Sequence, residues 1–406
     1  MSVITALLPP RWTEFLRRSF RSCLFAPLSV GAQAKVTGWM ARWFGRPAPA
    51  AAGRTDRIVV VKLDRIGDFV MVTPFLRELR RNHPFAWIAL VVSSKVEMLA
   101  TGCPYVDEVI ITPPPSPGLR GSWRQWLAWH ELAWRRLLPL RPTLALLPRW
   151  DVDLYEAYAL LALSGARRRV SYSAKITQPK ARLNRGADLL LTDAVSRSPG
   201  HHEVERNLGL LQALHLRVEA THEEIWLSID AQTLVRRLLP AQEHHRLVAL
   251  CPFSAEEIKN WPLSRFLEVV RHFADRPGVT FVLLADLGYA EISTCPKVRQ
   301  LSNLVSLAGR LSLAETAALI SRCDLVVSVD TGIMHIAGAL RRPLVLISGL
   351  STDQETESHY SPTRFGPWRS DYTLVAPRTS VAGPRGIDAV SVDQVVAAVE
   401  SRLSAA

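Results

Sequence analysis

Residues 57–81, RIVVVKLDRIGDFVMVTPFLRELRR, carry the pattern that decides the fold. The β-branched run Ile58–Val61 predicts a strand, and the apolar residues after Gly67 recur at helical spacing, which predicts a helix beyond a charged turn. Asp68 stands where the turn becomes the helix, at the carboxyl end of a predicted parallel strand, where open α/β sheets place their ligands. A carboxylate there is a candidate general base, although aspartate is also a preferred N-cap residue and could serve only the helix.

Short apolar segments alternate with helical patterns along the rest of the chain. After the first strand, the predicted strands are 87–92, 106–111, 144–147, 225–229, 247–251, 280–284, 304–306, 325–329 and 344–347. Strands separated by helices indicate βαβ units, so the predicted fold class is α/β with two successive Rossmann-like doubly wound domains. We expect an N-terminal extension and linker over 1–55, domains over 56–235 and 236–388, and a C-terminal helix over 389–406 that packs back on the first domain.

The composition is that of a globular protein. Of 406 residues, 48% are hydrophobic and 21% are charged, and no apolar run reaches the roughly 20 residues that a membrane-spanning helix needs. The five cysteines are scattered and never form a CxxC pair, which predicts neither a disulfide framework nor a zinc site and favours a reducing compartment. We therefore expect a cytoplasmic protein that is not integral to a membrane.

The formal net charge of +12 is concentrated at the N-terminal end. Residues 1–55 hold eight Lys and Arg against the single acid Glu14, a surplus of seven. Aromatic residues beside arginines, around Trp12 and Trp39, are typical of amphipathic helices that lie on anionic membranes. A helix packed on the first domain, a disordered extension and a signal peptide are the alternatives. Because the excess charge sits in a tail and matches no nucleic-acid module, the sequence does not predict nucleic-acid binding.

A second aromatic and basic stretch, GLRGSWRQWLAWHELAWRRLLPLR, occupies residues 118–141. Trp123, Trp126 and Trp134 recur at helical intervals beside Arg124 and Arg135. A helix of this kind beside a ligand site could hold an acidic amphiphile. The simpler interpretation is a helix that packs on the sheet and leaves its basic face in solvent.

The second predicted domain contains a strand, a tight turn and a small-residue helix over 325–340, LVVSVDTGIMHIAGAL. Gly332 lets the backbone approach a ligand closely, and the amides of the first helical turn form an anion site suited to a diphosphate. His335 falls one turn into this helix, shortly after Asp330 and Thr331. A single histidine is more often structural, but these neighbours make binding of a phosphate group the sharper hypothesis.

A further candidate is the loop CPFSAEEIKNWP, residues 251–262, which leaves the carboxyl end of another predicted strand. Ser254 can donate its hydroxyl to a phosphate, and Lys259 can neutralise negative charge that builds up on a leaving group. A lysine alone at this position would be read as a surface residue. Lys259 becomes a candidate site residue because two other predicted strand ends also carry candidate ligand-binding or catalytic residues.

These three segments resemble the heptosyltransferase-like glycosyltransferases of family nine. KLDRIGDFVMVTPFLRELR, the KNWP segment and SVDTGIMHIAGALRRPLVLISG match, in order, the family's GD near the amino end, its K/R-W-P segment and its DTGxxH turn. The resemblance runs from about residue 57 to 402 and also takes in VDEVI, LSGARRRVSY and HHEVERNLGLLQAL. The chain departs from the family pattern over residues 1–55, in the loop after Gly349, and at Phe253, where the family commonly has glycine.

The resemblance implies a GT-B fold, in which the first domain binds the acceptor and the second domain binds the nucleotide-sugar donor. By motif position, Asp68 corresponds to the general base that deprotonates the acceptor hydroxyl, and Lys259 to the cation on the diphosphate. The expected donor-binding residues are Ser254, Asp330, Thr331, Gly332 and His335. The expected acceptor-binding residues are Lys62, Arg65, Arg149 and Asp151.

The hypothesis is an inverting glycosyltransferase that moves a sugar, for example heptose from ADP-heptose, onto a lipopolysaccharide or other surface-glycan acceptor at the inner face of the cytoplasmic membrane. The basic segments suit an acidic, lipid-linked acceptor. No metal or other cofactor is expected, because Lys259 and helix amides can stabilise the diphosphate, and the DxD at 151–153 lies in the wrong domain for a nucleotide site. A nucleotide-sugar epimerase of the same architecture and a non-catalytic nucleotide-sugar or lipid-binding scaffold are the rivals.

Overall fold

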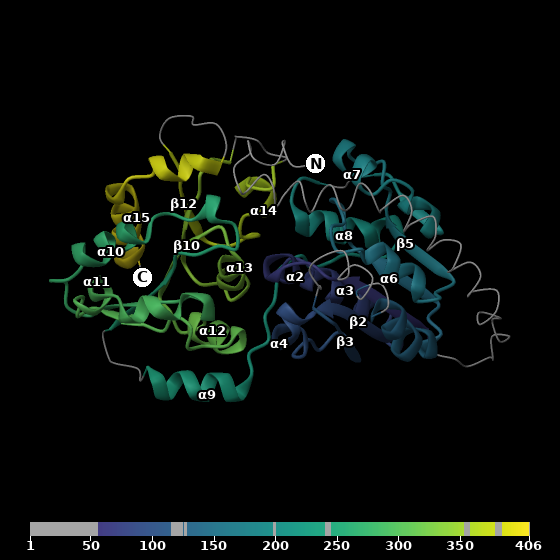
Figure 1. The fold of residues 1–406 in the computed structure, drawn as a ribbon, viewed down its shortest axis with the longest axis horizontal. Coiled ribbons are helices and arrows are strands. Elements are labelled where there is room, and N and C mark those ends of the chain that lie inside the picture. The colour runs from purple at the N-terminus through teal and green to yellow at the C-terminus, as the bar shows by residue number, and fades with distance from the viewer. Residues whose placement is uncertain are drawn as a thin grey trace, which may run out of the picture.

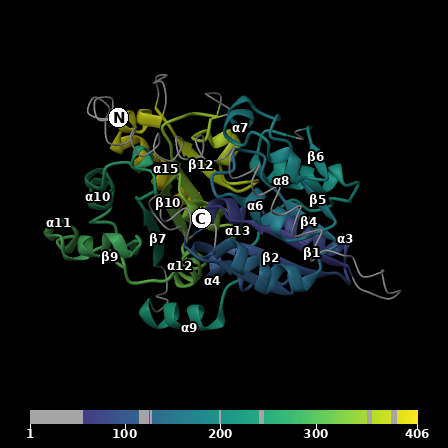
Figure 2. The ribbon, with the colours of Figure 1, turned by 45° about the vertical axis from the view of Figure 1, so that its right-hand side comes forward.

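The computed structural model has two parallel β-sheets side by side, each flanked by helices (Figure 1). The structure describes residues 56–405 apart from 115–124, 126–127, 198–199, 240–244, 353–357 and 378–383. The predicted extension over 1–55 lies outside the described residues, as do Trp123, Arg124 and Trp126 of the second aromatic stretch. Helices α2 (Ile66–Val70) and α13 (Gly332–Ala339) lie between the two sheets, and they stay adjacent in the turned view of Figure 2.

The first sheet has the order β3-β2-β1-β4-β5-β6, and all its neighbouring strands are parallel. Its strands are β1 (Arg57–Lys62), β2 (Trp87–Ser93), β3 (Glu108–Thr112), β4 (Leu144–Leu147), β5 (Arg168–Tyr172) and β6 (Asp193–Val195). The chain builds outward from β1 to β3 and then returns to β4 on the other side of β1. Such a reversal leaves a crevice at the carboxyl ends of the two central strands, where ligands bind. The loops after β1 and β4 therefore meet at one edge of the sheet.

The second sheet repeats this plan with the order β12-β11-β10-β7-β8-β9, again with parallel neighbours. Its strands are β7 (Arg246–Cys251), β8 (Val279–Leu283), β9 (Leu304–Ser306), β10 (Leu325–Val329), β11 (Leu344–Ile347) and β12 (Tyr372–Val375). Strands β7 and β10 are the central pair, with Ser328 opposite Cys251. The two phosphate-binding loops that the sequence predicts, after β7 and after β10, thus leave the same edge. This is the α/β fold of two doubly wound sheets that the alternation predicts.

Helices cover both sheets. Besides α2 and α13, the α-helices include α3 (Thr73–Asn82), α4 (Glu97–Ala100), α6 (Ala157–Leu163), α7 (Gln178–Leu183), α8 (Glu203–Ala213), α9 (Ile229–Leu238), α10 (Leu263–His272), α11 (Pro296–Arg299), α12 (Leu313–Ile320), α14 (Pro362–Phe365) and α15 (Val392–Ala405). Short 3-10 segments are η1 (Ser94–Val96), η3 (Leu138–Leu140), η4 (Ala187–Leu190), η5 (Glu257–Lys259), η6 (Leu287–Thr294) and η7 (Pro384–Ala389), and η2 (Ala133–Leu137) is a π-helix. Within the described part of the chain, no helix combines the length and apolar character needed to cross a membrane.

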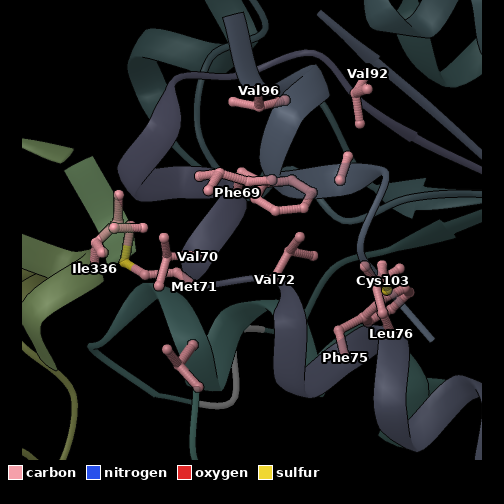
Figure 3. Packing of buried hydrophobic residues seen from close by; sticks show 14 of the residues in the cluster. Phe69, Val70, Met71, Val72, Phe75, Leu76, Val92, Val96, Cys103 and Ile336 are labelled. Carbon is pink, nitrogen blue, oxygen red and sulfur yellow. The ribbon is translucent and has the colours of Figure 1, made fainter. Parts of the chain in front are cut away.

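The largest buried hydrophobic cluster is shared by the two halves of the molecule. Val70 and Met71, at the end of α2, belong to the same cluster as Met334 and Ile336 of α13. Figure 3 shows Ile336 beside Val70 and Met71. Each apolar side chain of this size stabilises the fold by roughly 1.5–3 kcal/mol when it is fully buried. The contact between α2 and α13 is therefore a packed interface.

One predicted strand is absent. Residues 221–228, which include most of the strand predicted at 225–229, have no regular secondary structure, and α9 begins at Ile229. The backbone of this segment bonds to side chains of α3, since the amide of Glu224 donates to Thr73 Oγ1 at 3.0 Å. Nearby, the amide of Glu219 donates to Glu78 Oε2 at 2.9 Å. Side-chain acceptors on α3 thus replace the strand partner that the apolar pattern predicts.

The last helix, α15, packs on the second sheet, which corrects the prediction that it returns to the first domain. Its buried residues Val395, Val399 and Leu403 belong to the cluster that contains Val248 of β7 and Phe266 of α10. Figure 1 places α15 on the side of the second sheet that faces away from the first domain. The apolar face of α15 is covered there by α10 and by β10 to β12, so no apolar stripe is left to bind the first domain.

Helix α14 makes the contact that α15 was expected to make. Arg364, in α14, is 2% exposed and reaches residues of the first sheet's helices and loops. Its Nε donates to Glu203 Oε1 of α8 at 2.8 Å, and its Nη2 donates to Asp151 Oδ2 at 2.5 Å. Just beyond the helix, the carbonyl of Gly366 lies 2.9 Å from His202 Nε2. The chain therefore crosses back to the first domain at α14, before β12.

Candidate functional site

The N-terminal ends of α2 and α13 touch, and two glycines allow this contact. A Cβ built on Gly67 would lie 2.6 Å from Cδ2 of His335, and one built on Gly332 would lie 2.7 Å from Cβ of Ile66. Both separations are shorter than real side-chain contacts, so any larger residue at either position would push the helices apart. Because α2 follows β1 and α13 follows β10, the contact joins the central loops of the two sheets.

Asp68 lies in the first turn of α2, beside this contact. The N-cap of α2 is Arg65, whose backbone is extended, so Asp68 is not the cap residue that the sequence left as an alternative. Its side chain is 19% exposed, and Oδ1 lies 3.6 Å from Nη1 of Arg149. Burial and the neighbouring Asp64 carboxylate raise the pKa of Asp68, while Lys62 and Arg149 oppose the rise. A partly exposed carboxylate with a raised pKa is a suitable general base.

A group of buried charged residues lies next to Asp68. Asp64 accepts from Nη1 of Arg149 at 2.7 Å and pairs with Nζ of Lys62 at 3.0 Å. Burial favours the neutral form of Asp64, but Arg149 and Lys62 outweigh it and lower the pKa of this carboxyl. The Lys62 ammonium is 3% exposed and also donates to the carbonyl of Pro148 at 3.3 Å. Lys62, predicted as an acceptor contact, thus lies beneath the surface and holds the loops after β1 and β4 together.

Asp151, another predicted acceptor contact, is buried and engaged by the second domain. Besides the bond from Arg364, its Oδ2 lies 3.1 Å from Nδ1 of His359. Burial would raise the pKa of Asp151, but Arg364 and Arg149 dominate and hold it well below its usual value. Asp153, the other acid of the DxD, accepts from the amides of Tyr155 and Tyr158 at 2.9 and 3.1 Å. These two carboxylates therefore serve the interface and the start of α6.

On the second domain, Lys259 and Asp330 bring the loops after β7 and β10 together. Nζ of Lys259 donates to Oδ2 of Asp330 at 2.7 Å and lies 5.2 Å from the ring centre of Tyr360. Burial lowers the pKa of Lys259, but Asp330 and Glu256 outweigh this effect and raise it, so the ammonium stays charged. A small pocket opens beside this pair, lined by Lys259, Asp330, Ile347, Ser348, Gly349, Leu350, Tyr360 and Ile387.

The remaining predicted donor-binding residues lie at the start of α13 and in the loop after β7. Thr331 is the N-cap of α13, but no side-chain bond caps the helix. His335 is 3% exposed, and burial, followed by the charges of His202 and Lys259, lowers its pKa to about 3. A neutral imidazole packed against Gly67 therefore lies one turn from the first amides of α13. In the loop after β7, the amide of Ser254 donates to Oδ1 of Asn260 at 2.6 Å, and the Ser254 hydroxyl accepts from the amide of Glu256 at 3.4 Å.

An ion pair links the two domains at the site. Arg65, which precedes α2, bonds through Nη1 to Oε1 of Glu256, in the loop after β7. Burial would raise the pKa of Glu256, but Lys259 and Arg65 outweigh it and lower the pKa. Glu256 therefore stands between the two cations, one from each domain. Phe253, where the related family commonly has glycine, stacks on Tyr289 with ring centres 3.9 Å apart.

The structure thus brings the predicted base together with Lys62 and Arg149, whereas Arg65 turns to Glu256 of the second domain. Asp330, Thr331, Gly332 and His335 lie together at the start of α13, and Lys259 joins this turn to the loop that holds Ser254. Glu203, Arg364 and Glu256 were not singled out from the sequence. Glu203 lies inside HHEVERNLGLLQAL, which is part of the family resemblance, so that segment was the available signal. Among the described residues, no group of three or more His, Cys, Asp or Glu side chains is arranged to hold a metal ion.

Comparison with known proteins identifies relatives of both sequence and fold. The model of glycosyltransferase family 9 (heptosyltransferase) matches residues 159–380, more than half of the chain. Lipopolysaccharide heptosyltransferase 3 of Escherichia coli (strain K12) is 25% identical over 211 residues, which is 50% of this chain, and the chain spans 60% of the length of that relative.

Two solved structures share the fold over nearly their whole length. The family 9 glycosyl transferase from Veillonella parvula gives a TM-score of 0.71 at 20% identity, covering 88% of this chain and all of that one. The E. coli ADP-heptose lps heptosyltransferase II gives 0.66 at 19% identity, covering 86% of this chain and 99% of that one. At these identities the similarity establishes the fold, which is the GT-B arrangement of two facing Rossmann-like domains.

Proposed function

The chain belongs to glycosyltransferase family 9, the heptosyltransferase family, and from that premise we propose that it transfers heptose from ADP-heptose to a lipopolysaccharide core or related surface glycan. The names of its relatives support this donor and this class of acceptor. The first domain, with Asp68, would bind the acceptor. The second domain, with Lys259 and the start of α13, would bind the donor.

The proposed reaction is a single displacement at the anomeric carbon. Asp68 takes the proton from an acceptor hydroxyl, and the oxygen attacks the anomeric carbon from the face opposite the leaving diphosphate. The new glycosidic bond forms as the bond to the ADP oxygen breaks, so the configuration inverts and ADP leaves with both bonding electrons. Lys259 and the first amides of α13 stabilise the charge that develops on the diphosphate. His335, neutral at pH 7 because burial lowers its pKa to about 3, can only contribute a hydrogen bond or packing.

One observation carries the proposal more than any other. The contact of Gly67 with His335 places the helix that holds Asp68 against the helix whose N-terminus follows Asp330. The proposed base and the proposed anion site therefore lie on two adjacent helices from different domains. Displacement between an acceptor and a nucleotide sugar needs this arrangement, because nucleophile and leaving group must lie on opposite faces of the transferred carbon.

The direct test measures ADP release and product mass from the purified full chain with ADP-heptose and a heptose-deficient lipopolysaccharide core. Asp68→Asn removes the base while keeping the shape of the side chain. We expect kcat to fall by about 10²–10⁴-fold, the usual contribution of a general base, with an unchanged melting temperature. Turnover of Asp68→Asn near the wild-type rate would remove Asp68 from this role. An isomerised nucleotide sugar formed without acceptor would instead indicate an epimerase.

Two further features belong to the proposal. The reaction is expected to need no metal ion, because protein cations and amides meet the diphosphate, and activity that survives chelation with EDTA would support this. The protein is also expected to work at the inner face of the cytoplasmic membrane, where a lipid-linked acceptor is accessible. The basic and aromatic residues within 1–55 support attachment to that surface.

A further inference from the structure

Two buried lysines bind the loop that follows β4. Three successive carbonyls of this loop, those of Pro148, Arg149 and Trp150, accept bonds from lysine ammonium groups. Lys180 Nζ donates to Arg149 at 2.7 Å and to Trp150 at 3.0 Å, and Lys62 Nζ donates to Pro148 at 3.3 Å. Lys62 has Asp64 as an ion-pair partner. Lys180 is the unusual member of the pair.

Lys180 is completely buried, with 0% of its surface exposed. Burial, followed by repulsion from Arg149, lowers its pKa to about 7. Within the described part of the chain, no carboxylate lies within ion-pair distance of Nζ, and the Tyr158 ring centre is 5.5 Å away. Burying an ammonium group without a carboxylate partner is costly, and an apolar side chain would fill this space more cheaply. The arrangement therefore indicates a task for the two carbonyl bonds.

The two carbonyl bonds hold the part of the loop from which the Arg149 side chain extends. Its main chain is held by Lys180, and its Nε and Nη2 donate to the carbonyl of Val152 at 3.1 and 2.9 Å. These bonds leave Nη1 directed at the acids after β1, at 2.7 Å from Asp64 and 3.6 Å from Asp68. With its backbone and two of its three guanidinium nitrogens fixed, Arg149 has little freedom to move away from Asp68.

We propose that Lys180 is a positioning residue for the transfer reaction: through the carbonyls of Arg149 and Trp150, it fixes the Arg149 guanidinium beside Asp68. This inference rests on the proposed function only in taking Asp68 as the base. A neutral amine still has two N–H donors, so Lys180 can hold both carbonyls after it loses its proton. The role of Lys180 is then geometric, and its effect reaches Asp68 through Arg149.

The position of Arg149 matters because it controls when Asp68 is ionised. Burial and Asp64 raise the pKa of Asp68, and Lys62 and Arg149 hold it down. If the Arg149 guanidinium moves away, the pKa of Asp68 should rise, and activity should fall most at low pH. The charged or titratable groups that face Asp68 are Asp64, Lys62, Arg149, Glu203 and Tyr155. Those that face Lys180 are Arg149, Asp153, Asp151 and Asp188.

The test compares pH profiles of kcat/KM for the full chain and for Lys180→Met, which keeps the length of the side chain and removes its donors. We expect the acid limb of the profile to move to higher pH, so that activity falls about tenfold at pH 6 and about twofold or less at pH 9. Lys175→Met changes an exposed lysine of the same segment and should leave the profile unchanged. An acid limb of Lys180→Met at the wild-type position would overturn the proposal, even if the overall rate fell.

A double-variant comparison tests whether Lys180 acts through Arg149. Arg149→Met should shift the acid limb in the same direction, and adding Lys180→Met to it should shift the limb no further. Additive shifts would contradict a role through Arg149. If Lys180→Met does not fold, Lys180→Gln keeps an NH2 group on a shorter side chain that reaches the two carbonyls less well. It should give a smaller shift in the same direction, whereas a wild-type limb would overturn the proposal.

A titration of the free protein separates this inference from the proposed function. In protein labelled with ¹³C at aspartate carboxyls, Asp68 is identified by comparison with Asp68→Asn, and its pKa is read from the chemical shift. Lys180→Met should raise the pKa of Asp68, and an unchanged pKa would overturn the inference. If the wild-type protein transfers no heptose, the proposed function fails while this measurement still decides whether Lys180 positions Arg149.

Discussion

Lys259 illustrates how single residues of the site restrain one another. Its ammonium is bound to Asp330 at 2.7 Å, so a diphosphate that binds there must share the cation with a carboxylate. Sharing keeps the ammonium in place without neutralising it, because Asp330 and Glu256 outweigh burial and raise the pKa of Lys259. The residue is therefore charged throughout the pH range in which Asp68 ionises.

We predict that Lys259→Met lowers kcat/KM for the donor by about 10²–10³-fold, because the charge that stabilises the leaving diphosphate is lost. Steady-state kinetics with varied ADP-heptose give the measurement. Lys297→Met, an exposed lysine of the same domain, is the matched control and should behave like the wild type. A change within twofold for Lys259→Met would show that the leaving group is stabilised elsewhere.

Glu223 provides a prediction about pH and stability. It is 4% exposed, and burial raises its pKa to about 8 from a usual value of 4.5. An acid with a raised pKa in the folded state favours folding fully below its unfolded pKa, and this contribution is lost as pH rises from about 4.5 to 8. Glu223→Gln removes the ionisation. We expect its free energy of unfolding to match that of the wild type near pH 5 and to exceed it by about 3 kcal/mol at pH 8.

Urea unfolding at both pH values gives this measurement. Glu223→Asp, which keeps the carboxyl group, should retain the pH dependence of the wild type. Equal stabilities of Glu223→Gln and the wild type at pH 8 would show that the buried carboxyl finds a partner or water that relieves its cost.

Local and distant partners differ in how well the sequence reveals them. Asp68 and Asp330 were predictable, because each follows closely on a strand with a β-branched run: Asp330 comes directly after β10, and Asp68 lies in the helix that begins four residues after β1. The partners of Asp151 and Arg149 gave no such signal. Arg364 lies 213 residues from Asp151, and Lys180 lies 31 residues from Arg149, with no periodic pattern connecting either pair. Only the fold brings these charges together.

At the scale of elements, the contact of α2 with α13 governs the distance between the acceptor and donor halves. We predict that Gly332→Ala lowers kcat by more than about tenfold, because the new Cβ would meet Ile66 and small displacements of reacting groups are costly. Each sheet should remain folded, since the clash lies between them. Circular dichroism and steady-state kinetics give the two measurements.

A compensating variant makes this prediction sharper. Ile66→Gly removes both atoms that Gly332→Ala would meet first, because these are Cβ and Cγ2 of Ile66 at 2.7 and 2.8 Å. The double variant should therefore recover activity toward the level of Ile66→Gly alone. If it does not, the glycine serves phosphate binding rather than helix approach.

The errors of element prediction have a common physical cause. Residues 225–229 have the apolar pattern of a strand, yet their neighbourhood bonds to Thr73 and Glu78 of α3. Helix α15 has an apolar stripe that fits either domain in principle, and the face of the second sheet formed by β10 to β12 covers it. In both cases the apolar pattern indicates that a segment packs against another element. It does not say against what.

At the scale of the whole molecule, the sequence predicts both sheets because alternating strands and helices are a repeated local signal. The local pattern does not place the two sheets relative to each other. Their relative position depends on the contact between α2 and α13, which needs residues without side chains. The part that Gly67 and Gly332 play in this contact is evident only once α2 and α13 face one another. The family resemblance supplied the facing arrangement that periodicity alone leaves open.

The N-terminal segment gives a prediction for the intact chain. We expect the full chain to sediment with vesicles that contain anionic phosphatidylglycerol and a chain of residues 56–406 to bind them several-fold less, because residues 1–55 carry a surplus of seven positive charges. Neutral phosphatidylcholine vesicles are the control, and added salt should weaken the binding by screening. Equal binding of the two chains would place any membrane contact elsewhere.

The shared hydrophobic cluster has a consequence for how this molecule melts. Met71 and Ile336 belong to one cluster although they come from opposite halves, and Arg364 ties the second half to Asp151 and Glu203 of the first. Neither half can lose its structure without exposing apolar surface and unpaired charge on the other. Calorimetry should therefore record one cooperative heat-absorption peak for the whole chain. The two domains, which are proposed to bind different substrates, would then unfold in a single transition.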